Sequence, residues 1–160
     1  MFRIGQSTDI HQLVPNRKLV LGGVEIKSDK GLLGHSDADA LLHAIIEAII
    51  GAMGLKDIGT HFSDKDERYR GISSMVLLAK TYEMMNDHGY MIGNVDSLIL
   101  VETIKMAPYI DKMRENIAKV LHTDINQINV KATRGEGLGF IGRSEGIMAQ
   151  AVVLLVSKNG

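Results

Sequence analysis

The segment that most constrains the fold is a predicted helix at about residues 37–53, because almost all of its side chains are apolar. From residue 41 to residue 50, His43 and Glu47 are the only polar residues. Together with Asp39 they recur at every fourth position, which places all three on one helix face, one turn apart. A helix this apolar needs a sheet or other helices to cover it. Its polar face indicates either a core histidine with ordinary hydrogen bonds or a functional imidazole, and the segment alone leaves both open.

The start of this helix is a candidate phosphate site. It follows a glycine-flanked polar loop, Gly31 to Asp37, in which the side-chain oxygen of Ser36 or Asp37 is expected to cap the first turn. Free N–H groups and the positive end of the helix dipole favour an anion at such a terminus. His35 and Ser36 come just before the helix and could contact a phosphate.

The rest of the pattern predicts one α+β domain that spans residues 1–160. Strands are expected at residues 2–10, 94–102, 128–133 and 146–156, a hairpin at 18–26, and further helices after Ser73 or Ser74 and after Pro108. We expect a two-layer sandwich in which a mixed four-stranded sheet carries helices on one face, with the small β-hairpin beside it. Because the strand at 146–156 is almost wholly apolar, we expect partner subunits to cover the second face of the sheet.

Composition and charge exclude several classes of function. Lys and Arg number 18 against 19 Asp and Glu, without a block of like charge, so no nucleic-acid partner is expected. The apolar runs are far shorter than the about 18 residues of a membrane helix, and the first residues lack the layout of a signal peptide. We therefore expect a cytoplasmic protein with no membrane partner. There are no cysteines, so a metal ion would have to be bound by imidazole and oxygen.

Asp9, His11 and His43 are the candidate metal ligands. Asp9 and His11 are two residues apart at the end of the first predicted strand, so their side chains share a face. One carboxylate, two imidazoles and an open fourth position make a catalytic Zn²⁺ arrangement, and further open positions would suit Fe²⁺ or Mn²⁺. Sequence spacing does not show that this strand meets the helix, so the alternative is three unrelated side chains.

A glycine-rich loop after the strand at 128–133 could bind phosphate and a second ion. Lys131, Thr133 and Arg134 supply two cations and a hydroxyl group, and Glu136 could hold a harder cation between phosphates. The alternative is an exposed loop with incidental charges.

Short motifs occur in a fixed order along the chain. They are Arg3-Ile4-Gly5, Asp9-x-His11, Gly34-His35-Ser36-Asp37-x-Asp39, His43, Asp57-Ile58-Gly59, Phe62-x-Asp64-x-Asp66, Gly93-Asn94-Val95-Asp96, Lys105-Met106, Asn129 to Thr133 and Leu138 to Gly146. Over essentially the full length, this set resembles the 2-C-methyl-D-erythritol 2,4-cyclodiphosphate synthase family. The resemblance implies conversion of 4-diphosphocytidyl-2-C-methyl-D-erythritol 2-phosphate to the cyclic diphosphate with release of CMP, in the non-mevalonate isoprenoid pathway. The 2-phosphate would attack the β-phosphate with the help of metal ions.

The resemblance also implies roles for single residues. Asp9, His11 and His43 would hold Zn²⁺, and Glu136 would hold Mg²⁺ or Mn²⁺ with the diphosphate. His35 would be catalytic, and so would Arg134, which stands where the family usually has a threonine. Asp39 and Glu47 would then be supporting residues that cap the helix or hold His43.

The substrate-binding residues that the resemblance implies fall into six stretches and two single positions. They are Asp9, Ile10 and His11; His35 and Ser36; Asp57, Ile58, Gly59, Phe62, Ser63, Asp64, Lys65 and Asp66; Val101, Glu102, Thr103, Ile104, Lys105, Met106, Ala107, Lys131, Ala132, Thr133, Arg134, Gly135 and Glu136; Phe140 and Arg143.

The family forms homotrimers with active sites between subunits and sheets facing the centre. A central cavity would place Phe140, Arg143 and Glu145 against an isoprenoid diphosphate, or these residues would simply pack at the interface. Arg134-Gly135, Ile104 and Ser63 depart from the usual family residues. We therefore expect the turnover rate and the nucleotide affinity to differ from those of the family, and the type of reaction to be the same. Competing interpretations are a metal-dependent phosphoesterase, a non-catalytic diphosphate-binding module and a purely structural trimer.

Overall fold

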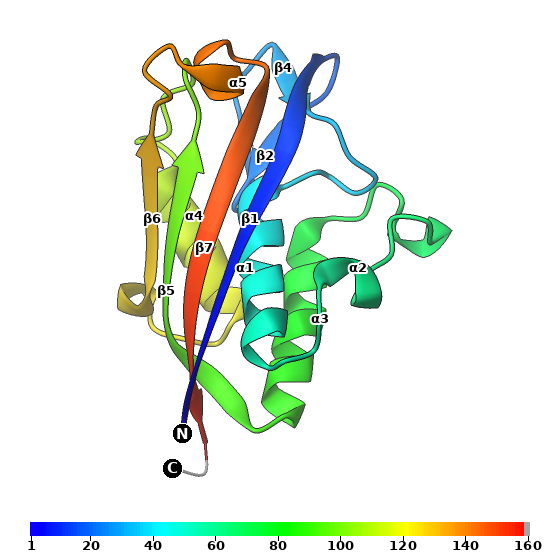
Figure 1. Ribbon diagram of the computed structural model, residues 1–160, viewed down its shortest axis with the longest axis vertical. Coiled ribbons are helices and arrows are strands. Elements are labelled where there is room, and N and C mark those ends of the chain that lie inside the picture. The colour runs from blue at the N-terminus through cyan, green and yellow to red at the C-terminus, as the bar shows by residue number, and fades with distance from the viewer. Residues whose placement is uncertain (159–160) are drawn as a thin grey trace.

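The long first strand, β1 (Phe2–Pro15), organises the sheet because it pairs on both of its edges (Figure 1). The computed structural model describes residues 1–158. β1 runs antiparallel to β7 (Gly146–Ser157), and its last residues pair with β4 (Lys30–Leu32). On the other side of β7 lie β5 (Tyr90–Leu100), which is antiparallel to it, and then β6 (Ile128–Thr133), which is parallel to β5. The sheet is therefore mixed, as predicted.

The prediction of four strands in this sheet was wrong, because the sheet has five within the part of the chain described. The missed strand, β4, pairs Leu32 with Leu13 and Lys30 with Pro15. Three residues are too few to show an alternating pattern, and the pairing depends on β1 continuing beyond His11. The predicted separate hairpin is present as β2 (Leu19–Leu21) and β3 (Val24–Ile26).

Helices cover one face of the sheet (Figure 1). The longer ones are α1 (Ala40–Ala52), α3 (Ser74–Asp87) and α4 (Ile110–Val120), and the shorter turns are α2 (Ile58–His61), η1 (Glu67–Tyr69), η2 (Ile125–Gln127) and α5 (Gly139–Gly142). α1 packs against β1, β7 and α3, while α4 packs against β6. Every residue of α1 is buried except His43, Glu47 and Gly51, so the polar face predicted from the sequence is the face that is not fully covered.

The prediction that Ser36 or Asp37 caps α1 was wrong, while the capping role expected of Asp39 is confirmed. Asp39, rather than Ser36 or Asp37, caps the helix, and its carboxylate accepts a hydrogen bond from the N–H of Leu42 at 3.0 Å. The helix does not begin at residue 37 because Ala38 has a φ of 57°, which lies in the left-handed region. Ser36 and Asp37 are therefore free for contacts outside the helix.

β1 lies very close to α1. A Cβ atom added to Gly5 would lie 1.8 Å from the carbonyl oxygen of Ala48, so only glycine fits there. Along β1, Gly5 and Ser7 are buried and Asp9 and His11 are partly buried, and all four alternate with exposed residues. The alternation confirms that Asp9 and His11 share the face that meets the helices.

The opposite face of the sheet is uncovered in the single chain, and it carries exposed apolar side chains together with Gln6, Thr8 and Gln150. Phe2, Ile4 and Ile10 on β1 and Val152 on β7 all leave at least half of their surface exposed. Apolar patches of this kind on a sheet commonly bind another protein surface. None of the helices within residues 1–158 is long and apolar enough to cross a bilayer.

Candidate active site

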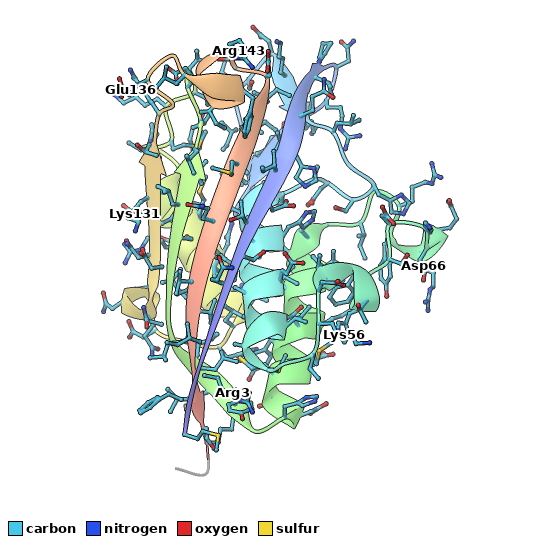
Figure 2. The ribbon with its side chains drawn as sticks, in the orientation of Figure 1. Arg3, Lys56, Asp66, Lys131, Glu136 and Arg143 are labelled. Carbon is cyan, nitrogen blue, oxygen red and sulfur yellow. The ribbon has the colours of Figure 1, made fainter. Side chains whose placement is uncertain are left out.

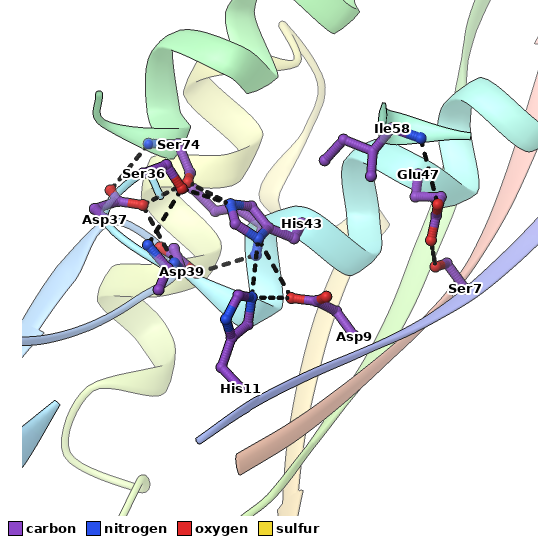
Figure 3. A network of polar contacts seen from close by, with 12 residues as sticks. Ser7, Asp9, His11, Ser36, Asp37, Asp39, His43, Glu47, Ile58 and Ser74 are labelled. Atoms are coloured by element: carbon purple, nitrogen blue, oxygen red, sulfur yellow. Dashed lines mark hydrogen bonds and ion pairs between the residues drawn. The ribbon is translucent and has the colours of Figure 1, made fainter. Parts of the chain in front are cut away.

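Asp9, His11 and His43 meet where β1 crosses α1, as predicted for metal ligands (Figure 3). His11 Nε2 lies 2.8 Å from Asp9 Oδ2, and His43 Nδ1 lies 3.3 Å from the same oxygen. The two imidazole nitrogens are 3.3 Å apart. One ligand atom from each residue falls within 4.8 Å of the others, which is the spacing that a single bound ion requires.

The environment of Asp9 fits a cation. Its Oδ2 atom is buried without a hydrogen-bond partner among residues 1–158, and the groups nearest to it are the nitrogens of the two imidazole rings. Burial alone raises the pKa of Asp9, but the hydrogen bonds and charges of His11 and His43 outweigh burial and lower it to about 2. The carboxylate is therefore ionised at neutral pH. An anionic oxygen beside two imidazole nitrogens is a donor set that suits Zn²⁺.

A backbone carbonyl orients His11. Its Nδ1 atom lies 2.7 Å from the carbonyl oxygen of Leu33, which can only accept, so Nδ1 carries the proton and Nε2 faces the cluster. Burial by itself lowers the pKa of His11, but the hydrogen bond and negative charge of Asp9 outweigh it and raise the pKa. Metal-ligating histidines are commonly held in this way by a carbonyl behind the ring.

The cluster lies in the wall of a cavity of about 380 Å³. Most of the cavity residues were predicted from the sequence, and only Gly34, Tyr69 and Leu77 were not. The predicted ones are Asp9, His11, His35, Ser36, His43, Ile58, Gly59, Phe62, Ser63 and Asp64. Ile10 does not line it, because its side chain is exposed on the other face of β1.

The loop after α1 is tied to the cavity by His35 and Glu47. His35 Nε2 donates to the carbonyl oxygen of Asp66 at 3.0 Å. Glu47 accepts from the hydroxyl of Ser7 and, at 3.3 Å, from the N–H of Ile58, so it joins β1, α1 and α2 (Figure 3). Glu47 is thus a supporting residue for the loop; no hydrogen bond is described between its carboxylate and His43.

Two of the predicted substrate contacts in this loop are capping residues. Asp57 accepts from the N–H and hydroxyl of Thr60 at the start of α2, and those hydrogen bonds lower its pKa. Asp66 caps η1 and pairs with Arg68, whose hydrogen bonds lower the pKa of Asp66 to about 2. Neither carboxylate lines the cavity directly, and neither does Lys65.

A second cavity, of about 620 Å³, contains Thr103, Ile104 and Lys105. Lys27, Lys30 and Tyr109 also line it and were missed from the sequence, because only folding brings the segment before β4 beside residues 103–105. The neighbouring Val101 and Met106 are buried in the core. This cavity combines lysine side chains with apolar ones, which suits a phosphorylated organic ligand.

The loop that carries Arg134 and Glu136 lies away from the cluster. Figure 2 shows Lys131 and Glu136 on the β6 side of the sheet and Asp66 on the opposite side of the molecule. Arg134 and Glu136 are exposed, and Lys131 pairs with Asp96 at 2.6 Å. A single chain therefore does not bring Glu136 to the Asp9 cluster.

The fold and the site together define an α+β protein with a candidate carboxylate–imidazole metal site beside a cavity between sheet and helices. The YgbB family model matches residues 2–156. The chain belongs to this family.

Relatives and solved structures agree with that assignment. The chain is 57% identical over 154 residues to the 2-C-methyl-D-erythritol 2,4-cyclodiphosphate synthase of Clostridioides difficile, covering 96% of each chain. It is 59% identical over 157 residues to the synthase of Finegoldia magna, covering 98% and 99%. The structure resembles the bifunctional IspDF of Campylobacter jejuni, with a TM-score of 0.94 and 38% identity, where all of this chain matches 44% of that one. It also resembles the CDP complex of IspF from Plasmodium falciparum, with a TM-score of 0.87, 36% identity and coverage of 99% and 97%. The resemblance noted in the sequence is thus confirmed.

Proposed function

We propose that this protein is a 2-C-methyl-D-erythritol 2,4-cyclodiphosphate synthase, a phosphorus–oxygen lyase of the non-mevalonate isoprenoid pathway. Its substrate is 4-diphosphocytidyl-2-C-methyl-D-erythritol 2-phosphate, and its products are the cyclic diphosphate and CMP. The observation that carries the proposal is the cluster of Asp9, His11 and His43 beside an open cavity. The names of the relatives support the choice of substrate.

The reaction is an intramolecular phosphoryl transfer. An oxygen of the 2-phosphate bonds to the β-phosphorus, the bond from that phosphorus to the bridging oxygen breaks, and its electron pair leaves with CMP. Such a transfer needs positioning and charge neutralisation more than a covalent enzyme intermediate. Asp9, His11 and His43 would hold Zn²⁺, which would supply Lewis-acid polarisation of a phosphoryl oxygen. Glu136 would hold Mg²⁺ or Mn²⁺ with the diphosphate.

Three side chains face the phosphates in this proposal. His35 donates through Nε2 to the Asp66 carbonyl, so its other ring nitrogen, an acceptor in the neutral ring, remains for a hydroxyl group on the substrate phosphate. Ser36 lines the same cavity with its hydroxyl group. The exposed guanidinium of Arg134 binds a phosphate oxygen in place of the usual threonine, and such charge-assisted contacts are among the stronger hydrogen bonds.

We further propose a homotrimer with active sites between subunits and sheets facing the centre. One subunit provides the Asp9 cluster and the loop at 57–66, and its neighbour provides residues 101–107 and 131–136 around the cytidine diphosphate. The separation of these two groups in one chain supports this arrangement. The exposed apolar side chains on the second face of the sheet, Phe2 and Ile4 among them, support it as well.

An isoprenoid diphosphate at the trimer centre is the last part of the proposal. Phe140 belongs to α5 at one end of the sheet, and the nearby Arg143 is exposed and pairs with Glu145 at 2.8 Å. A guanidinium beside apolar surface suits a diphosphate with a hydrocarbon chain.

Phosphorus NMR tests the function directly. The purified protein is incubated with the cytidyl substrate, Zn²⁺ and Mg²⁺, and CMP together with the cyclic diphosphate is expected. Inorganic phosphate as the product would replace the proposal with a phosphoesterase, and binding without turnover would replace it with a binding module.

A further inference from the structure

Ser74 reaches the back of the imidazole of His43. It is the first residue of α3, it is fully buried, and its Oγ atom lies 2.9 Å from His43 Nε2 (Figure 3). The same hydroxyl also donates to the carboxylate of Asp37, which accepts the backbone N–H of Ser74 as well, at 2.9 Å. Ser74 lies 31 residues after His43 and 37 after Asp37, so only the tertiary structure brings it to them.

Capping does not explain this arrangement. The cap of α3 is the neighbouring Ser73, whose side chain accepts from the N–H of Met75. The hydroxyl of Ser74 is therefore not needed to begin the helix. A buried hydroxyl with both a carboxylate and an imidazole as partners restricts the positions of all their protons.

The direction of each hydrogen bond follows from the chemistry of the partners. The carboxylate oxygens of Asp37 accept from both the backbone N–H and the hydroxyl of Ser74, so the hydroxyl proton of Ser74 points at Asp37. The Oγ atom of Ser74 can then only accept from His43, which places a proton on Nε2 of the ring. In the neutral imidazole, Nδ1 is left with its lone pair, and Nδ1 is the nitrogen that faces Asp9 and His11.

We propose that Asp37 and Ser74 are positioning residues that hold His43 in the tautomer with Nδ1 free to bind the metal ion. The inference rests on the metal site of the proposed function and extends it by two residues. Carboxylate-backed histidines bind metal more tightly because the ring is both oriented and more basic. Here the carboxylate acts through a serine rather than by direct contact.

We call the hydrogen bonds from His43 through Ser74 to Asp37 the relay. The relay also leaves the hydroxyl proton of Ser36 available. The Oγ atom of Ser36 lies 3.1 Å from His43 Nε2 and accepts from the N–H of Ala38 at 3.3 Å. Because Nε2 carries a proton, the hydroxyl of Ser36 cannot donate to it. Ser36 lines the cavity, so its proton is free to point toward a substrate oxygen there.

Two variants and one control test the relay. Ser74→Ala leaves Ser36 as the remaining hydroxyl partner of His43 Nε2. Ser36 can then donate to Nε2 and favour the tautomer that has its proton on Nδ1. Asp37→Asn is close in shape, and its amide oxygen keeps the backbone N–H of Ser74. Its NH₂ group then donates to the Ser74 hydroxyl, which turns toward His43. Ser73→Ala removes the cap of the same helix without touching the ring.

Zinc affinity is measured by competition with a chromophoric chelator, using Zn²⁺ alone as the probe. We expect affinity to fall about 10- to 100-fold in Ser74→Ala and Asp37→Asn and to stay at the parent value in Ser73→Ala. Long-range proton–nitrogen NMR of the metal-free proteins, in mildly alkaline buffer, reports the tautomer itself. The parent is expected to carry the His43 proton on Nε2, and Asp37→Asn to carry it on Nδ1.

The outcomes separate the relay from the proposed function. Parent affinity and an Nε2 proton in both variants would overturn the relay, and an effect of Ser74→Ala alone would remove Asp37 from it. If the parent binds no zinc, the tautomers of the metal-free proteins still decide for or against the relay, and the metal site fails separately. Failure to form the cyclic diphosphate would contradict the proposed function and leave the tautomer result standing.

Discussion

The carboxylate of Glu102 accepts a hydrogen bond from the backbone N–H of Gly135 at 2.8 Å, which ties the chain after β5 to the loop that carries Arg134 and Glu136. Its second oxygen accepts from the N–H of Gly137 at 3.2 Å. Both oxygens of Glu102 therefore hold the loop backbone. The glycine-rich loop gains a fixed shape from a residue 33 positions earlier in the chain.

Replacing Glu102 with Gln is expected to loosen this loop, because the amide NH₂ group would face one of the two backbone N–H groups. A hydrogen bond to a charged group contributes about 1.5–3 kcal/mol, so we expect turnover to fall roughly tenfold or more. Zinc affinity should not change, since the Asp9 cluster is elsewhere. Glu115→Gln on α4 removes the same charge from the surface and serves as the control. Parent turnover in Glu102→Gln would show that the loop holds its shape without the two hydrogen bonds to the Glu102 carboxylate.

Arg134 is expected to bind a substrate phosphate. Arg134→Ala should lower kcat/KM about tenfold or more, because a charge-assisted contact is lost. Arg134→Thr restores the hydroxyl that the family usually has and should retain more activity than Ala. Steady-state kinetics on the natural substrate distinguish the two. Equal rates for Ala and the parent would remove Arg134 from the reaction.

His43→Ala is expected to lose bound zinc and activity together, since one of the three ligands of the cluster is removed. Metal content is measured by elemental analysis, and activity by release of CMP. His88→Ala removes an imidazole at the far end of α3, where the ring contacts the Met84 carbonyl, and should keep the parent metal content. Full activity of metal-free His43→Ala would contradict the zinc assignment.

Asp39→Ala is expected to destabilise the fold by about 2–4 kcal/mol. The substitution removes the cap of α1 and leaves the N–H groups of Gly22 and Gly23 without their acceptor, at 2.9 and 2.8 Å in the parent. Chemical denaturation measures the change. Asp124→Ala removes an exposed cap from η2 and should cost no more than about 1 kcal/mol. Similar losses of stability in the two variants would show that the hydrogen bonds from Gly22 and Gly23 to Asp39 contribute little to the free energy of unfolding.

Gly5→Ala and Gly51→Ala are expected to change stability in opposite directions. The added methyl group at Gly5 meets the Ala48 carbonyl oxygen at 1.8 Å, so β1 and α1 must separate and the midpoint of thermal unfolding should fall markedly. Gly51 lies in α1 with no atom within 4 Å of an added Cβ, so alanine should stabilise the helix by about 0.5–1 kcal/mol. An unchanged midpoint for Gly5→Ala would contradict the close packing.

Several features could be predicted because neighbours in the sequence decide them. The two-residue separation of Asp9 and His11 placed both on one face of a strand. The four-residue separation of His43 and Glu47 placed both on one face of a helix. The bounds of β6 matched the prediction in full. Periodicity of this kind depends only on backbone geometry, so tertiary contacts did not alter it.

Other features depended on contacts between distant segments. Asp39 caps α1 in place of Ser36 or Asp37, because Ala38 adopts a left-handed conformation and the N–H groups of Gly22 and Gly23 donate to Asp39. β4 was missed because three residues gain their strand geometry only by pairing with the end of β1. Neither signal exists in a local window of sequence.

The sequence by itself determined the ligand types, the faces they occupy and, through its motifs, the family. The tertiary structure alone decided that Asp9 and His43 meet, that Ser74 contacts the back of the His43 ring, and that Glu136 lies at the β6 edge of the sheet, away from that cluster. The physical reason is that side-chain direction follows from local backbone geometry. Proximity instead requires the sheet and helices to pack, which depends on burial summed over the whole chain.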